Sequence, residues 1–291
     1  MDGMEAAPDG APGAGLEAAN GVIVYKMTGS GNDFVFVDGR ATPLQFWTAH
    51  RIRAVCARQN GVGADGLVVL EPGSNVGAVR LHYFNRDGLR AELCGNASLC
   101  AARLATWIEL APVERLVLET DAGPVPGRSL PGTGELAEIG LGEVSGMRPA
   151  DVELTRGETA AHYVRIGVPH LVVQVRDLEA VDVVARGRAL RLHPAFEPDG
   201  ANVNFVSCGT SGWAMRTYER GVEDETLACG TGSVAVASIL AETGRQSLPL
   251  DLRTASGCIL RVEGGRRGPG HFENMKLIGE GRLVFRAILG G

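Results

Sequence analysis

Two cysteines, Cys94 and Cys229, lie in matching sequence contexts. The first is within YFNRDGLRAELCGNASLCAARLA (83–105) and the second is within TYERGVEDETLACGTGSVAVASIL (217–240). In each segment, the end of an aromatic-containing strand leads into a polar, acidic turn. Cysteine, glycine and a small polar residue follow, and then an alanine-rich apolar run that is typical of a helix. Each cysteine is therefore predicted to lie where a loop becomes a helix.

A cysteine at the start of a helix suits a particular chemistry. The free N–H groups and the positive end of the helix dipole bind anions such as a carboxylate. They also lower the pKa of a nearby thiol below its free value of about 8.5, which favours a reactive thiolate. Two such helix starts could hold one carboxylate between them and present a sulfur to each face of the adjoining carbon. This arrangement suits racemisation.

The alternative is that these cysteines only fill the core, because a free cysteine is usually a small buried hydrophobe. For one cysteine alone, core packing would be the better interpretation. Two cysteines in matching sequence contexts favour the interpretation that both are reactive. The other thiols, which have no matched partner, are interpreted as structural: Cys56, Cys100, Cys208 and Cys258.

The composition excludes several classes of function. The chain has 291 residues, with 28 basic and 34 acidic side chains and a net charge of -6, which does not favour nucleic-acid binding. Six cysteines without a CxxC pair argue against a disulfide scaffold, structural zinc and thioredoxin-like chemistry, and favour a reducing cytoplasm. No apolar run approaches the roughly 20 residues of a membrane span, and residues 1–20 lack a basic export signal. We therefore expect a cytoplasmic protein that contacts no membrane.

Lysine is nearly absent, since Lys26 and Lys276 are the only two. A pyridoxal enzyme needs a Schiff-base lysine, and a P-loop needs the GxxxxGK[ST] motif. Neither lysine lies in such a setting, so these two cofactor chemistries are not expected.

The order of predicted elements indicates an α+β fold made of two similar halves. Residues 1–20 are expected to be a disordered tail. Strands and helices then follow: a hairpin through 22–38, a helix at 48–58, a glycine loop at 60–66, strands at 67–70 and 78–84, the first cysteine frame with its helix to about 109, and a strand at 116–119. A Pro/Gly-rich segment, 126–135, is the expected domain crossing. The second half repeats this order with strand residues 166–175, a helix at 181–188, strand 202–206 and the second frame.

At these residues the chain resembles the diaminopimelate epimerases, which are cofactor-independent amino-acid epimerases. Four segments carry the resemblance: KMTGSGNDFVFVD, RQNGVGADGLVVL, FNRDGLRAELCGN and YERGVEDETLACGTG. Proline racemases and phenazine-type isomerases share the fold but not the GNDF opening. The resemblance implies two pseudo-symmetric domains, each a mixed β-sheet curled around a central helix, with the active site in the cleft between them. The implied domains are 21–128 and 129–281, with 282–291 returning to the first.

The resemblance also implies roles for individual residues. Cys94 and Cys229 match the catalytic acid and base, and His170 and Glu219 match residues that support the thiols. The remaining positions match substrate-binding groups: Asn32 at the reacting end, the amides of Gly95, Asn96, Gly230 and Thr231 around the α-carboxylate, and Asn85, Asn202 and Arg220 at the distal amino-acid head, with Glu219 also near the substrate. No cofactor or metal is implied. The resemblance does imply a homodimer that acts on a small amino-acid substrate in lysine and cell-wall precursor biosynthesis.

The chain departs from the family pattern at three places. Thr28 stands where the family usually has His, Val168 where it usually has Asn, and CGNASLC replaces a CGNG continuation with Arg. Val168 bears on substrate choice, because an apolar side chain replaces an amide that would bind the distal head. The alternatives are therefore a racemase or epimerase of another amino acid, such as a proline-like one, and a non-catalytic amino-acid binder or thiol redox protein.

Overall fold

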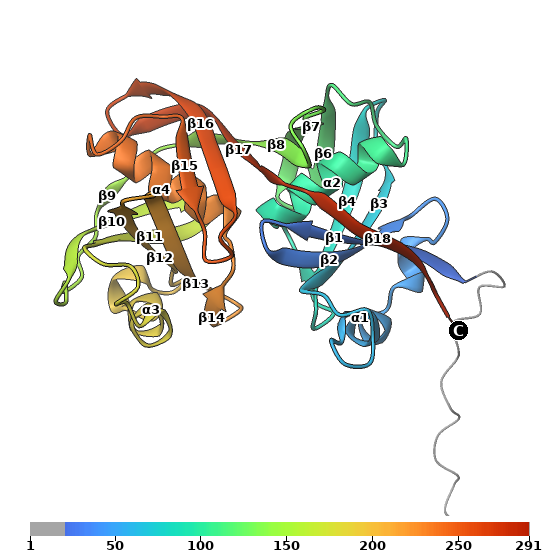
Figure 1. The fold of residues 1–291 in the computed structure, drawn as a ribbon, viewed down its shortest axis with the longest axis horizontal. Coiled ribbons are helices and arrows are strands. Elements are labelled where there is room, and N and C mark those ends of the chain that lie inside the picture. The colour runs from blue at the N-terminus through green and yellow to red at the C-terminus, as the bar shows by residue number, and fades with distance from the viewer. Residues whose placement is uncertain (1–20, 291) are drawn as a thin grey trace, which may run out of the picture.

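The computed structural model describes residues 21–290, which form two lobes joined by long strands (Figure 1). The predicted tail, residues 1–20, lies outside the described residues. The N-terminal lobe contains β1 (Val22–Gly29), β2 (Asn32–Asp38), a 3-10 turn (Leu44–Phe46), α1 (Ala49–Cys56), β3 (Gly66–Pro72), β4 (Ala78–Asn85), β5 (Arg90–Ala91), α2 (Gly95–Trp107), β6 (Leu116–Thr120) and β7 (Gly123–Ser129).

The C-terminal lobe repeats this order of elements. It contains β9 (Arg148–Pro149), β10 (Glu158–Ile166), β11 (Val168–Val175), α3 (Val183–Arg191), a 3-10 turn (Pro194–Phe196), β12 (Asn202–Gly209), β13 (Gly212–Glu219), β14 (Asp224–Thr226), α4 (Gly230–Glu242), β15 (Leu250–Arg253) and β16 (Ile259–Gly268). Three further strands connect the lobes or return to the first: β8 (Leu136–Val144), β17 (His271–Glu280) and β18 (Arg282–Leu289).

Strand pairing follows one pattern in both lobes. From β1 through β2, β3, β4, β6, β7 to β8, successive pairs are antiparallel, parallel, antiparallel, parallel, antiparallel and antiparallel. The series β10, β11, β12, β13, β15, β16, β17 has the same sequence of pairings. Each parallel pair needs a crossover, which α1, α2, α3 and α4 supply. The predicted α+β fold of two similar halves is confirmed.

The central helices α2 and α4 are enclosed by the sheets (Figure 1). In each of them, ten of the 13 residues are buried, so each helix is covered on all sides. Small residues such as Ala101, Ala102, Ala235 and Ala237 let the strands pack close to the helix axis. Both helices belong to one continuous hydrophobic cluster.

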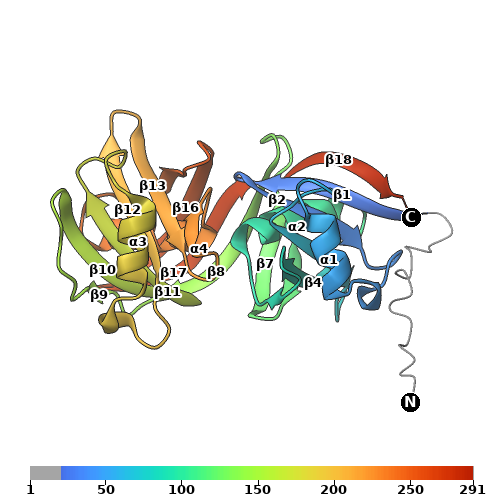
Figure 2. The same cartoon turned by 90° about the horizontal axis from the view of Figure 1, so that it is seen from below.

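The outer helices α1 and α3 lie on the same side of the molecule (Figure 2) and cover the other face of each sheet. Ile52 and Val55 of α1 pack on one sheet, and Val183 and Leu190 of α3 pack on the other. Helix α1 begins after Thr48, whose side chain accepts a hydrogen bond from the Arg51 N–H at 3.3 Å. No helix within residues 21–290 is long and apolar enough to cross a membrane.

Several boundaries differ from the sequence prediction. The helix predicted over 48–58 ends at Cys56, and α2 ends at Trp107 instead of about residue 109. Residues 166–175 are not one strand, because the chain turns at Gly167, which has a φ of +66°. Part of the Pro/Gly-rich segment is regular, since β7 extends to Ser129. The last strand, β18, pairs with β1 from Val22–Leu289 to Thr28–Arg282.

Candidate active site

Cys94 and Cys229 are the N-cap residues of the two central helices, as predicted. Their backbones are nearly identical, with φ/ψ of −134°/117° and −129°/111°. The carbonyl oxygen of Cys94 accepts hydrogen bonds from the N–H and hydroxyl of Ser98, and that of Cys229 accepts the same pair from Ser233. The extended N-cap conformation turns each cysteine side chain out of the helix, beside the free N–H groups of the first turn.

The starts of α2 and α4 meet at the junction of the lobes. A Cβ atom added to Gly95 would lie 3.4 Å from the Cα atom of Gly230. The buried Asn96 side chain crosses the junction, because its Nδ2 donates to the carbonyl oxygen of Ala228 at 3.2 Å and to Asn32 Oδ1 at 2.7 Å. The free amides of Gly95, Asn96, Gly230 and Thr231 thus lie on two helix starts that approach each other.

Burial raises the pKa of both thiols, contrary to the sequence prediction of lowered values. The Cys94 thiol has a pKa raised to about 12, although the N–H groups of Ala97 and Asn96 and the Tyr83 hydroxyl lower it. Burial, followed by the nearby Glu219 carboxylate, raises the pKa of Cys229, although the Gly232 N–H lowers it. The helix starts therefore act in the predicted direction, but desolvation outweighs them.

Hydroxyl groups accompany both thiols, but they differ in kind. Tyr83, on β4, hydrogen-bonds Cys94 through its phenol, whose own pKa is raised by burial. Thr231, in the first turn of α4, places Oγ1 3.7 Å from Cys229 Sγ. The phenol stays protonated at neutral pH and donates to Cys94, so the two thiols are not equivalent.

Glu219 ends β13 and lies close to both thiols. Burial raises the pKa of this carboxyl, although the Thr226 hydroxyl donates to its Oε2 at 2.9 Å. The Glu219 carboxylate in turn raises the pKa of Cys94 and of Cys229. His170, on β11, is fully buried, and burial lowers its pKa to about 3, so the imidazole is neutral.

The polar residues expected to bind the distal head form two groups. Asn202 Oδ1 accepts from the backbone N–H of Arg220 at 2.8 Å, and Asn202 is the parallel-strand partner of His170. The Arg220 guanidinium donates to the Asp199 carbonyl oxygen at 3.2 Å. Asn85, in contrast, is exposed at the end of β4.

The reacting-end residue Asn32 is tied to the glycine loop. Its Nδ2 donates to Asp65 Oδ2 at 3.1 Å, and the Arg58 guanidinium holds the same carboxylate at 2.7 Å. Thr28 is buried, and Val168 is half-buried at the start of β11. Because side chains alternate along a strand, Val168 lies on the same face of β11 as His170.

Sequence reasoning missed Tyr83, Asp65 and Asn204. Tyr83 is the aromatic residue at the strand end of the first frame, which is the only signal that marked it. Asp65 lies within the glycine loop and orients Asn32. Asn204 is the second asparagine of NVNFV, and it contacts His170. Among residues 21–290, no group of three His, Cys, Asp or Glu side chains is arranged to hold a metal ion.

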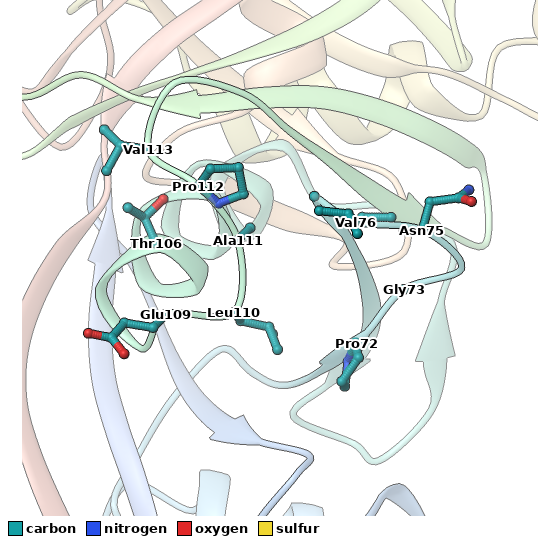
Figure 3. A pocket seen from close by; sticks show the side chains of 12 residues that line it. Pro72, Gly73, Asn75, Val76, Thr106, Glu109, Leu110, Ala111, Pro112 and Val113 are labelled. Atoms are coloured by element: carbon teal, nitrogen blue, oxygen red, sulfur yellow. The ribbon is translucent and has the colours of Figure 1, made fainter.

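A surface hollow of about 640 Å³ lies elsewhere, between the β3–β4 turn and the end of α2 (Figure 3). Its lining includes Pro72, Val76, Leu110 and Pro112. None of the candidate residues lines it, so it is separate from the paired thiols.

The fold is that of a group of two-lobed solved proteins whose members include an epimerase and a phenazine biosynthesis protein. A phenazine biosynthesis protein of the PhzF family from Bacillus anthracis has the same fold, with a TM-score of 0.71 and 15% identity over 93% of this chain and 99% of that one. A hydroxyproline epimerase from Agrobacterium vitis matches with a TM-score of 0.67 and 16% identity over 94% and 93%.

The chain belongs to the diaminopimelate epimerase family. The sequence model of that family, described as diaminopimelate epimerase, matches residues 24–134 and 162–264. A diaminopimelate epimerase from Gemmatimonas aurantiaca is 44% identical over 91% of this chain and 98% of its own length. One from Aquifex aeolicus is 39% identical over 82% and 88%. The protein is therefore an isomerase of the epimerase class.

Proposed function

We propose that this protein interconverts LL- and meso-diaminopimelate, in lysine and cell-wall precursor biosynthesis, with Cys94 and Cys229 as the two bases. The observation that carries this proposal is the pair of cysteines that cap two central helices whose first residues meet at the lobe junction. One substrate carbon held there would have a sulfur on each side.

In each direction, one sulfur as thiolate takes the α-proton, and the other as thiol gives its proton to the opposite face of the carbon. The carbon thus inverts, the net charge is unchanged, and the thiol and thiolate have exchanged roles. The raised pKa values make each thiolate rare at neutral pH but, once formed, a strong base toward a weakly acidic C–H bond.

The developing charge spreads onto the α-carboxylate, which the amides of Gly95, Asn96, Gly230 and Thr231 would hold. Helix-start amides in a site without water stabilise such a charge without reorganising. Asn32 would contact the same end, since Asn96 already holds its side chain at the junction. His170 and Glu219 would support the thiols from either side.

Recognition of the distal head would fall to Asn85, Asn202 and Arg220. The guanidinium of Arg220 is the charge partner that a second carboxylate needs, and a bidentate contact of this kind is strong and directional. The Asn202 side chain accepts a hydrogen bond from the backbone N–H of Arg220 and so helps to position that residue. Glu219, the residue before Arg220 in the sequence, would contact an ammonium group of the substrate.

Val168 favours a second candidate, an epimerase or racemase of an amino acid without the distal head, such as a proline-like one. Its half-buried apolar side chain lies on the His170 face of β11, where it offers no hydrogen bond to a distal ammonium or carboxylate. A non-catalytic binder or thiol redox protein would leave one of the two cysteines without a defined use.

We also propose a homodimer in a reducing cytoplasm, with domains at 21–128 and 129–281 and the last strand in the first domain. All six thiols are free, which fits that compartment. The pairing of β18 with β1 supports the return of the last strand. The boundary at 128 falls within β7, and the chain leaves the first lobe along β8.

The deciding experiment is exchange of the α-proton in deuterated water, with the purified protein and a panel of diaminopimelate, proline, lysine and glutamate. We expect exchange with diaminopimelate and little or none with the others, because a substrate that lacks the distal head offers no carboxylate to the half-buried Arg220 guanidinium. Exchange of proline at the same rate would favour the second candidate, and no exchange at all would favour a binder.

The panel is repeated with Arg220→Ala and with Arg245→Ala, a control at an exposed arginine after α4. We expect Arg220→Ala to lose most of kcat/KM for diaminopimelate, while Arg245→Ala retains it. Equal activity of the two variants would remove Arg220 from the substrate site.

A further inference from the structure

Behind the second cysteine lies a buried network of polar side chains, of which the proposed function uses only His170. Asn204 of β12 and Thr217 of β13 are almost completely buried, as is His170 of β11. Thr217 Oγ1 lies 3.0 Å from Asn204 Oδ1, and Asn204 Nδ2 lies 3.3 Å from His170 Nδ1. Three adjacent strands therefore contribute one side chain each to a single network.

The orientation of the Asn204 amide follows from a third contact. The Leu171 carbonyl oxygen lies 3.1 Å from the Asn204 nitrogen. A backbone carbonyl can only accept a hydrogen bond, so the Asn204 atom that faces it must be the NH2 group. The Oδ1 atom then faces Thr217, whose hydroxyl donates to it. Both contacts fix the amide in one of its two possible orientations.

This orientation determines the tautomer of His170. The NH2 group of Asn204 donates one hydrogen to Leu171 and the other to His170 Nδ1, so Nδ1 must be the unprotonated ring nitrogen. The proton of the neutral imidazole is then on Nε2. Burial also lowers the pKa of His170 to about 3, so the ring carries only this one proton at neutral pH.

His170 Nε2 is buried and has no hydrogen-bond partner among residues 21–290. A buried donor without an acceptor is costly, so its persistence indicates an acceptor that arrives with the reaction. The network also adjoins the second thiol. A Cβ atom on Gly232, in the first turn of α4, would contact Asn204 Oδ1 and would lie 3.1 Å from Cys229 Sγ.

We propose that Asn204 and Thr217 are positioning residues that hold His170 as the neutral Nε2–H tautomer, so that His170 donates a hydrogen bond to the reacting groups. His170 then does not act as the base that takes a proton from either thiol, because its free nitrogen, Nδ1, is occupied by the Asn204 amide. The tautomer follows from the network alone, whereas the use of the donor rests on the proposed epimerase reaction.

The first test is the tautomer itself, read from the ring nitrogen shifts of protein labelled with 15N-histidine. The His170 signal is assigned by its loss in His170→Gln. We expect the Nε2–H form in the wild-type protein across neutral pH. An Nδ1–H form or a protonated ring at pH 7 overturns the proposal, whatever the activity.

The second test compares Thr217→Val with Thr217→Ser. Valine has nearly the same shape but removes the hydroxyl that fixes the amide, whereas serine keeps it. We expect Thr217→Val to yield a mixture of His170 tautomers and to lower kcat by about tenfold, the effect of one misdirected buried hydrogen bond, with KM little changed. Thr217→Ser should keep the Nε2–H tautomer and most of kcat.

Equal tautomers and equal kcat in these two variants would contradict the role of Thr217. If Thr217→Val does not fold, the wild-type tautomer measurement still decides the proposal. An Nε2–H tautomer in a protein without α-proton exchange would leave the network intact and refute the epimerase function instead.

Discussion

Gly95 and Gly230 approach each other so closely that a Cβ atom built on either would lie 3.4 Å from the Cα atom of the other. These glycines are the first residues of the two central helices. The two lobes therefore meet backbone to backbone at the point where both helix dipoles are positive. A carboxylate bound there lies within reach of amides from both halves of the molecule.

This contact predicts unequal effects of alanine at the two positions. A Cβ atom on Gly95 would make only ordinary contacts, whereas one on Gly230 would lie 2.7 Å from Leu277 Cδ2. We expect Gly95→Ala to change the free energy of unfolding by less than about 1 kcal/mol and Gly230→Ala to lower it by about 1–3 kcal/mol. Both should reduce kcat/KM, because each narrows the space for the carboxylate.

Denaturant unfolding and turnover are measured on both variants, with Gly209→Ala as the control. Nothing lies within 4 Å of a Cβ atom at Gly209, so that variant should match the wild type in both measurements. Greater stability of Gly230→Ala than of Gly95→Ala would contradict this prediction, because it would show that Leu277 moves to make room for the added Cβ atom at little cost.

The repeated cysteine frame was sufficient to predict the duplicated fold and the N-cap position of both thiols. It could do so because an apolar helix period, a glycine and a polar turn are local properties of the chain. The thiol pKa values were not predictable in the same way. The helix start favours the thiolate as expected, but burial of Cys94 and Cys229 in the folded protein raises their pKa values by more.

The positions of Tyr83 and Asn204 show the same limit. Each is an ordinary strand residue by its local pattern, and each gains its contact only when another strand or helix packs against it. Gly167 is a further example of this limit. The apolar run 166–175 was predicted as a single strand, but it contains a turn at Gly167, which has a positive φ.

Removal of either candidate base should abolish epimerisation. We expect Cys94→Ala and Cys229→Ala each to lower kcat by at least about 10²–10⁴-fold, the usual contribution of a general acid or base. Each variant should still fold, because a small side chain is replaced by a smaller one. Cys100→Ala, at a buried cysteine six residues after Cys94 in α2, is the matched control and should remain active. Substantial turnover by either single variant would exclude the two-base reaction.

Loss of the Tyr83 hydroxyl should affect one thiol only. That hydroxyl lowers the pKa of Cys94, and its own raised pKa keeps it protonated as a donor. In Tyr83→Phe we expect the pKa of Cys94 to rise and its alkylation at pH 8–9 to slow by about tenfold, the loss of one hydrogen bond to a charged group. Cys229 should react as in the wild type.

The alkylation rate of each cysteine peptide is followed by mass spectrometry. Tyr25→Phe is the control, because Tyr25 packs edge-on against Trp107 and not against a candidate thiol. Equal slowing of Cys94 and Cys229 in Tyr83→Phe would indicate a general change of the site and would contradict a direct bond to Cys94.

The buried His170 should make stability depend on pH on the acid side. Its pKa is lowered from 6.5 to about 3 in the folded protein, so between these values the unfolded chain binds a proton that the folded protein does not. Stability from this residue is therefore fully present above pH 6.5 and is lost as the pH falls toward 3, with a slope of at most about 1.4 kcal/mol per pH unit.

Glutamine cannot take up this proton. We expect the free energy of unfolding of His170→Gln, measured with urea from pH 7 to pH 4, to fall less steeply than that of the wild type, while the exposed-site control His50→Gln runs parallel to the wild type. The carboxyl groups titrate in all three proteins, so the difference between the curves isolates His170. Parallel curves for the wild type and His170→Gln would mean that the imidazole takes up its proton in the folded protein, and it would then be available as a base beside the thiols.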